Sequence, residues 1–186
     1  MFQLVDEHLS EGLSMEMRYH MSQRAFRTVW WLRACDRHFL QALAFHVERE
    51  AFAPGERIAS VDPMTGDVRL CILEEGTAAR TGTLLTSGSF WGDVLLSSKL
   101  LRDTRSARSL TYAEIVLFDR QALLQVMSEH PESAKAVRAV ALRIAFRRSI
   151  RVTAMFARLH AHKAAACADD STATAVGDAW GGHAPG

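Results

Sequence analysis

The stretch GSFWGDVLL at positions 88–96, followed by RDTRSARSLTY at 102–112, constrains the fold of this chain more than any other feature. Glycine at positions 88 and 92 permits tight turns in which backbone N–H groups approach a bound anion. We expect a short helix to begin at Asp93 and to point its partly positive end toward the same anion. The second stretch is expected to be a strand whose side chains lie opposite. Together the two stretches predict a phosphate-binding loop.

The region around this loop has the pattern of a small all-β barrel or roll. Short apolar segments over residues 51–118 are separated by turn-forming residues, and periodic helical patterns are absent. The turn-forming residues are Pro54, Gly55, Pro63, Gly66, Gly76, Gly82, Gly88 and Gly92. This part of the chain therefore predicts short strands joined by tight turns.

A helical segment precedes the β region. Apolar residues over 5–50 recur at helical spacing, and Ser14 and Asp36 are candidate N-caps. Behind Asp36 the apolar positions are Phe39, Leu40, Leu43 and Val47. We expect helices that pack one apolar face against the roll.

Two helices are expected after the β region. Asp119 can cap the first, which ends before Pro131 because the residue preceding a proline is disfavoured in a helix. The second begins at Glu132 and continues as an amphipathic helix to about residue 160. Beyond it, the Ala, Gly, Asp and Ser content cannot build a core, which predicts a disordered tail over residues 161–186.

Composition sets limits on the class of protein. A chain of 186 residues with 48% hydrophobic residues can bury one substantial core, which favours one domain with an appendage. The net charge of +1 neither favours nor excludes a polyanionic partner. All but three of the basic residues are arginines, which suit planar, bidentate anion contacts. Cys35, Cys71 and Cys167 are odd in number and widely separated, so we expect reduced thiols.

Several classes of protein lack support in the sequence. No apolar run approaches the roughly 20 residues that cross a bilayer, and no secretory leader is recognisable, so we expect a soluble chain. No nucleophile elbow or zinc-protease motif occurs, and the chain is expected not to be an enzyme. His160, His162 and Cys167 do not form a closed ligand set, and no metal is expected.

Several separate blocks of the chain resemble one known family. They are DEHLS at 6–10, VWWL at 29–32, CDRHFL at 35–40, FAPGERI at 52–58, LCILEEG at 70–76, GDV at 92–94 and SARSLTY at 106–112. In order and spacing, residues 5–148 resemble the cyclic nucleotide-binding domain of hyperpolarisation-activated, cyclic nucleotide-gated and ether-a-go-go channels. The blocks at 92–94 and 106–112 are closest to the ether-a-go-go pattern.

The resemblance implies a mainly β, α+β fold: an eight-stranded jelly-roll-like β-roll with N-terminal linker helices and two C-terminal helices. It implies the end of a helical C-linker over residues 1–30 and the cyclic nucleotide-binding-type domain over 31–160. The implied function is regulation of a voltage-gated-like potassium or cation channel from the cytoplasmic side of the membrane. The implied partners are cAMP or cGMP, the channel's transmembrane domain and three further copies in a homotetramer, with no nucleic acid.

The resemblance also assigns candidate ligand-binding residues. The backbone of Gly92, Asp93 and Val94 would contact the phosphate. Asp93 stands where the family usually has a glutamate that accepts hydrogen bonds from the ribose hydroxyl; alternatively, it is an acidic residue that serves only the dipole of the expected helix. Arg143 lies near the position of a lid arginine over the base; alternatively, Arg143, like Arg147 and Arg151, belongs to a solvated helix face.

The phosphate-binding arginine is the main departure from the family pattern. In an ungapped alignment its place is taken by Asp103, and that of the following threonine or serine by Thr104. A carboxylate at this position repels phosphate, so this register, which we favour, predicts weak or absent nucleotide binding. A shift by two residues gives the roles to Arg105 and Ser106, but requires a bulge in a strand.

Two other classes of protein remain as alternatives. A cyclic nucleotide-responsive transcription regulator shares the sensor domain, but here no second helix pair follows that could enter a DNA groove. An enzyme with the same roll architecture, as in cupins, needs a clustered histidine and carboxylate metal site, and the sequence has no such pattern.

Overall fold

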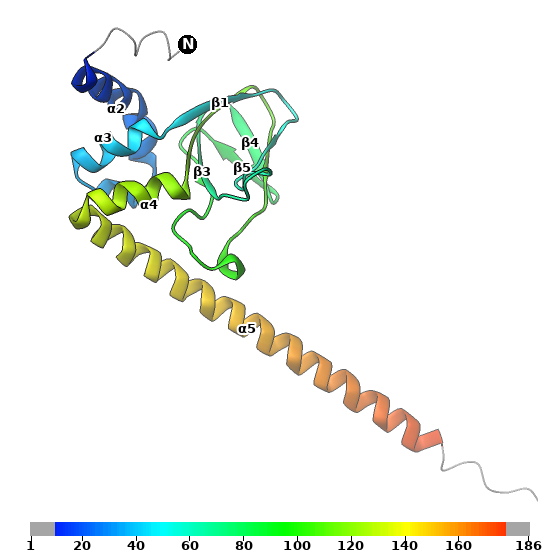
Figure 1. Ribbon diagram of the computed structural model, residues 1–186. Helices are drawn as coiled ribbons and strands as arrows, with labels where there is room; N and C mark the ends of the chain where they lie inside the picture. Colours follow the sequence, from blue (N-terminus) through cyan, green and yellow to red (C-terminus); the bar gives the residue numbers. More distant parts are fainter. Residues whose placement is uncertain (1–9, 178–186) are drawn as a thin grey trace, which may run out of the picture. The chain divides into compact units, whose positions relative to one another are not determined.

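The computed structural model describes residues 10–177, with side chains described through residue 158 except for that of Glu11. Contacts within the chain divide it into two compact units, Met1–Ile144 and Ala145–Gly186. The first unit contains all the strands and most of the helices (Figure 1). The second contains the continuation of the last helix.

Eight strands form two antiparallel four-stranded sheets in the orders β1-β8-β3-β6 and β2-β7-β4-β5. The strands of the first sheet are β1 (Glu48–Phe52), β3 (Arg69–Glu75), β6 (Phe90–Trp91) and β8 (Ala113–Asp119). Those of the second are β2 (Arg57–Ile58), β4 (Thr77–Arg80), β5 (Thr83–Thr86) and β7 (Ala107–Ser109). This architecture confirms the predicted eight-stranded, α+β roll.

The two central strands of the first sheet are buried on both faces. From β3, Leu70 and Ile72 pack with the helices, whereas Cys71 and Leu73 belong to a separate cluster with residues of the second sheet. Strand β8 alternates in the same way. Double-sided burial explains why both strands have continuous apolar runs in the sequence rather than alternating ones. Burial also raises the pKa of the Cys71 thiol to about 12, so this cysteine is unreactive at neutral pH.

Four helices among the described residues pack against the outer face of the first sheet. They are α2 (Glu11–Thr28), η1 (Leu32–Ala34), α3 (Arg37–Phe45) and α4 (Arg120–Glu129). Asp36 caps α3 by accepting a hydrogen bond from the backbone N–H of Phe39 at 2.9 Å, and Asp119 caps α4 through Ala122 at 2.6 Å, as predicted. The N-cap prediction for Ser14 is wrong, because α2 begins one turn earlier and Ser14 lies buried within it.

The last helix, α5 (Pro131–Gly177), begins directly after α4, close to the predicted start. The composition predicts a disordered tail from residue 161, and α5 instead continues as helix through residue 177. Composition alone misses this because alanine, abundant in this stretch, has the highest helix propensity. Residues 178–186 of the predicted tail, like residues 1–9 of the predicted linker, lie outside the described part of the chain.

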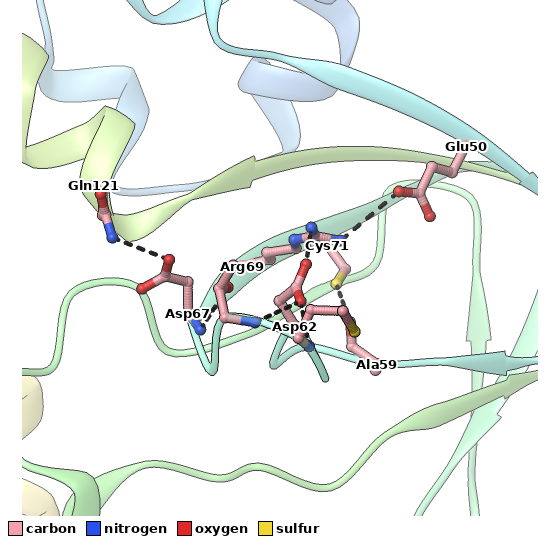
Figure 2. A network of polar contacts seen from close by, with 9 residues as sticks. Glu50, Ala59, Asp62, Asp67, Arg69, Cys71 and Gln121 are labelled. Carbon is pink, nitrogen blue, oxygen red and sulfur yellow. Dashed lines mark hydrogen bonds and ion pairs between the residues drawn. The ribbon is translucent and has the colours of Figure 1, made fainter.

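A polar network braces the turn between β2 and β3 (Figure 2). The Asp62 carboxylate accepts hydrogen bonds from the backbone N–H groups of Met64 and Thr65 at 2.7 and 3.1 Å and forms an ion pair with Arg69. Arg69 also lies 3.7 Å from a carboxylate oxygen of Glu50 on β1. The hydrogen bonds from Thr65 and Met64, followed by the charge of Arg69, lower the pKa of Asp62. The charge of Arg69 is therefore neutralised within the fold.

Candidate functional site

Gly92 holds the start of the predicted phosphate-binding loop against β3. Its φ is +104°, and a Cβ built on it would lie 2.0 Å from the carbonyl oxygen of Arg69. A side chain at this position therefore requires both a disfavoured backbone conformation and a displaced strand. The predicted need for glycine is confirmed, and close backbone approach adds a second reason for it.

The loop itself, residues 92–106, differs from the prediction. The short helix expected at Asp93 is absent: residues 93–96 form a single turn, closed by a 3.1 Å hydrogen bond from the N–H of Leu96 to the carbonyl of Asp93. A 3₁₀ turn, η2 (Lys99–Leu101), follows. The expected contribution of a helix dipole at Asp93 is therefore wrong. The side chain of Asp93 instead binds the backbone of Asp103.

Asp93 ties the two ends of this loop together. Its carboxylate accepts a hydrogen bond from the backbone N–H of Asp103 at 2.6 Å. The two residues are ten positions apart, and this bond closes the chain between them. The Asp93 carboxylate therefore does not cap a helix. One of its oxygens is already used to close the loop.

Asp103 lies between two arginines. Arg105 donates two hydrogen bonds to its carboxylate at 2.8 and 2.6 Å, and Arg80, at the end of β4, forms an ion pair with it at 3.1 Å. Hydrogen bonding from Arg105, with the charge of Arg80, holds the pKa of Asp103 well below its ordinary value. Asp103 is therefore ionised at neutral pH, and its charge is compensated by two guanidinium groups.

Arg80 is a site residue that the sequence analysis missed. Nothing in its surroundings in the sequence indicates a role, since it stands directly before the turn that leads to β5. It reaches the loop because β4 pairs with β7, with Ala79 opposite Arg108. It also donates to the carbonyl oxygen of Arg105 at 3.1 Å. Only the pairing of the strands brings these residues together.

The chain from 102 to 106 is irregular, and β7 begins at Ala107. A two-residue shift of register therefore needs no bulge, contrary to the prediction, because the alternation of side chains applies only within strands. Asp103 is half-buried, whereas Thr104 and Arg105 are exposed. Both candidate registers remain compatible with the backbone.

Two further arginines hold the first part of the loop, and the sequence analysis missed both. Arg102 donates to the carbonyl oxygens of Leu96 and Ser97 at 2.8 and 3.0 Å. Arg120, the first residue of α4, donates to the carbonyl oxygen of Val94 at 2.5 Å. Burial, together with the positive charge of Arg102, lowers the pKa of Arg120. The side chain of Val94 is buried below them, so only its backbone is available to a ligand.

Arg143 lies on α5, whereas the other predicted site residues lie on the loop over residues 92–106. It is exposed on α5, and no polar partner for it is found among the described residues. Within residues 10–177, no group of three or more His, Cys, Asp or Glu side chains is arranged to hold a metal ion. Over the same residues, no helix is long and apolar enough to cross a bilayer.

Comparison with known proteins identifies distant relatives. The chain is 23% identical over 145 residues to the cyclic nucleotide-gated channel cone photoreceptor subunit alpha of Gallus gallus, and 23% identical over 143 residues to cyclic nucleotide-gated channel alpha-3 of Homo sapiens. It is 22% identical over 141 residues to channel alpha-4 of Mus musculus. These matches cover 68–70% of this chain but only 19–24% of the relatives. No family model matches the chain.

Proposed function

We propose that this chain is a regulatory cyclic nucleotide-binding domain of the channel type, without enzymatic activity. The observation that carries the proposal is the glycine loop at Gly92, which connects β6 to the Asp103 cluster in a two-sheet roll. The similarity to cyclic nucleotide-gated channel alpha subunits supports it independently. The ligand is cAMP or cGMP, and its phosphate lies against the backbone of residues 92–94.

In this proposal the charge of the loop makes binding weak. A nucleotide phosphate approaching Gly92 meets the Asp103 carboxylate, whose two arginine partners are already engaged. Phosphate must compete with this carboxylate for Arg80 and Arg105, and hydrogen bonds between such charged groups are worth about 1.5–3 kcal/mol. Thr104, exposed beside them, is available to a phosphate oxygen. Arg143 covers the base when α5 closes.

The channel context extends the proposal beyond the bound nucleotide. Residues 1–30 are the end of a linker that joins this domain to the transmembrane domain of a potassium or cation channel, on the cytoplasmic side of the membrane. Four copies assemble around the pore axis, with contacts from residues before Arg27. Sedimentation of the chain, compared with a variant in which the exposed Leu13 and Met21 of α2 are replaced by glutamate, tests this: association that disappears in the variant supports the linker role, and a tight dimer in both contradicts it.

Titration calorimetry with cAMP and cGMP tests the nucleotide site. The natural chain should bind in the high micromolar range or more weakly, and Asp103→Arg should bind roughly tenfold more tightly, because it replaces a competing carboxylate with a phosphate donor. Glu129→Arg, with the same charge change on the exposed end of α4, should not alter the affinity.

Two results would overturn the proposal in different ways. Absence of heat with both nucleotides, for the natural chain and for Asp103→Arg at millimolar ligand, contradicts nucleotide binding. Tight binding by the natural chain that is lost in Arg105→Ala supports a nucleotide sensor but contradicts the role of Asp103, since the phosphate then uses Arg105.

A further inference from the structure

A cavity of about 350 Å³ opens behind the loop, between residues 94–97, α4 and the first turns of α5. This volume lies within the range of about 300–1,000 Å³ typical of small-molecule sites. All of its lining residues belong to the first compact unit. It shares Val94 with the backbone proposed to contact phosphate, but neither Asp103 nor Arg105 contributes to its wall.

The wall of this cavity is mainly apolar. Its floor contains Leu123, Met127 and Val137, all buried in the core that joins the helices to the first sheet. Leu124 and Leu142, which also line it, remain 47% and 71% exposed. Leucine side chains that line a cavity and face solvent gain free energy when an apolar molecule covers them, at about 25 cal/mol per Å².

The charged groups of the wall are all positive. Arg120 and Arg138 line the cavity, and none of the lining residues is acidic. Arg120 donates only to uncharged oxygens, the carbonyl of Val94 and, at 3.3 Å, the hydroxyl of Ser97. Arg138 is exposed, and no polar partner for it occurs among the described residues. Arg102, adjacent to Arg120, adds to the positive potential.

This combination selects the chemistry of an occupant. A purely apolar molecule would leave the two guanidinium groups without a counter-charge, and a cation would be repelled by them. A phosphate-sized ion alone would leave the leucines in water. We infer that the cavity binds an apolar molecule with one anionic head group, of the kind represented by a medium-chain fatty acid, with its carboxylate at Arg120 and Arg138. This site is additional to the proposed nucleotide site and does not depend on it.

Three probes with the same ten-carbon chain and different head groups test the inference on the full chain. Decanoate, decanol and decylamine are titrated calorimetrically below the solubility limit of decanol and below the micelle concentrations of the two charged probes. Decanoate should bind with one-to-one stoichiometry, and decanol and decylamine at least about tenfold more weakly, because they lack the charge-assisted contacts. Equal binding of all three head groups, or no binding of decanoate, overturns the inference.

Variants of the wall locate the binding. Arg138→Gln should weaken decanoate binding about tenfold, and it should fold normally because this side chain is exposed. Ala141→Trp should abolish binding, because Ala141 lines the cavity and the indole fills it. Arg151→Gln removes an exposed arginine of the same helix outside the cavity and should leave the affinity unchanged. Decanoate binding that is unaffected by both Arg138→Gln and Ala141→Trp contradicts the site.

Competition separates this site from the nucleotide site. Decanoate affinity measured in saturating cAMP should still fall about tenfold in Arg138→Gln. Direct displacement of decanoate by cAMP, in proportion to nucleotide occupancy, would mean that the cavity is part of the nucleotide site and would overturn the inference. Absence of cAMP binding leaves the decanoate result standing and contradicts only the proposed function.

Discussion

The turn around Asp62 contacts the side chain of Arg69, the loop around Gly92 lies close to the carbonyl oxygen of the same residue, and both are rich in arginine contacts. In the turn, the side chain of Arg69 is paired with Asp62 and lies near Glu50, while Gln121 donates to the neighbouring Asp67 at 3.0 Å (Figure 2). In the loop, Arg102 and Arg120 donate only to carbonyl and hydroxyl oxygens.

The arginine of the turn has its charge compensated by carboxylates, whereas the charges of Arg102 and Arg120 in the loop remain available to attract an anion. A guanidinium paired with a carboxylate contributes little field beyond its partner, whereas one that binds neutral oxygens keeps its full charge. Asp103 compensates the charges of Arg80 and Arg105. Among the residues that the structure describes, Arg102 and Arg120 form no ion pair, and they bind carbonyl and hydroxyl oxygens instead. The turn is therefore suited to holding the fold, and the loop to attracting an anion.

Gly92 joins the two regions, and substitution there should have the largest effect. Gly92→Ala should cost more than about 3 kcal/mol of unfolding free energy, because the new Cβ collides with the Arg69 carbonyl and φ is positive. Gly88→Ala is the matched control: its φ is +88°, but its nearest new contact is an ordinary 3.5 Å to a methyl group of Thr28. Chemical denaturation measures both, and equal losses would contradict the role of close backbone approach.

Replacing one arginine in each region tests the contrast between paired and unpaired charge. Arg69→Met should lower the unfolding free energy more than Arg120→Met does, because it leaves the Asp62 carboxylate without its ion pair. Arg120→Met should cost less than about 1 kcal/mol, since the lost bond to Val94 is partly offset by relief of repulsion from Arg102. Urea titration at low salt compares them. A larger loss for Arg120→Met would show that the loop arginines are chiefly structural.

The pH dependence of stability should report the pairing of Asp103. Arg105 and Arg80 place its folded-state pKa below the ordinary value of about 3.9. The ionised Asp103 carboxylate therefore contributes fully to the free energy of unfolding above about pH 4. This contribution is lost as the pH falls through the lower, folded-state pKa. Asp103→Asn should lower stability by about 1 kcal/mol at pH 7. Thermal unfolding from pH 6 to pH 2 should show this difference shrinking below about pH 4, and a constant difference would contradict it.

Arg105→Ala should have the smallest effect on folding. The Arg105 side chain is 64% exposed, and Arg80, only 17% exposed, continues to compensate Asp103. The unfolding midpoint should stay within the scatter of the measurement, while Arg80→Ala should lower it detectably. A reversed order would show that Arg105, rather than Arg80, holds the loop closed.

Much of the fold was predictable because its signals are local. Asp36 and Asp119 are short acidic side chains before apolar helical patterns, and each caps a helix. The prediction at Ser14 failed because propensity for a cap does not specify where a helix starts. In the site, the need for glycine at position 92 could be predicted from the sequence, but the contacts of Arg80, Arg102 and Arg120 could not. An arginine in a sequence gives no indication of which oxygen it will contact.

The linear order of residues was enough to predict a β region of short strands and tight turns, the caps of α3 and α4, and a glycine-dependent loop at Gly92. These features depend on backbone conformation and on burial patterns, which act over a few residues. Packing specified the rest: that Asp93 closes the loop instead of starting a helix, and that Arg80 reaches Asp103 through the pairing of β4 with β7. Charge compensation is a property of distances between side chains, and those distances exist only once the sheets have formed.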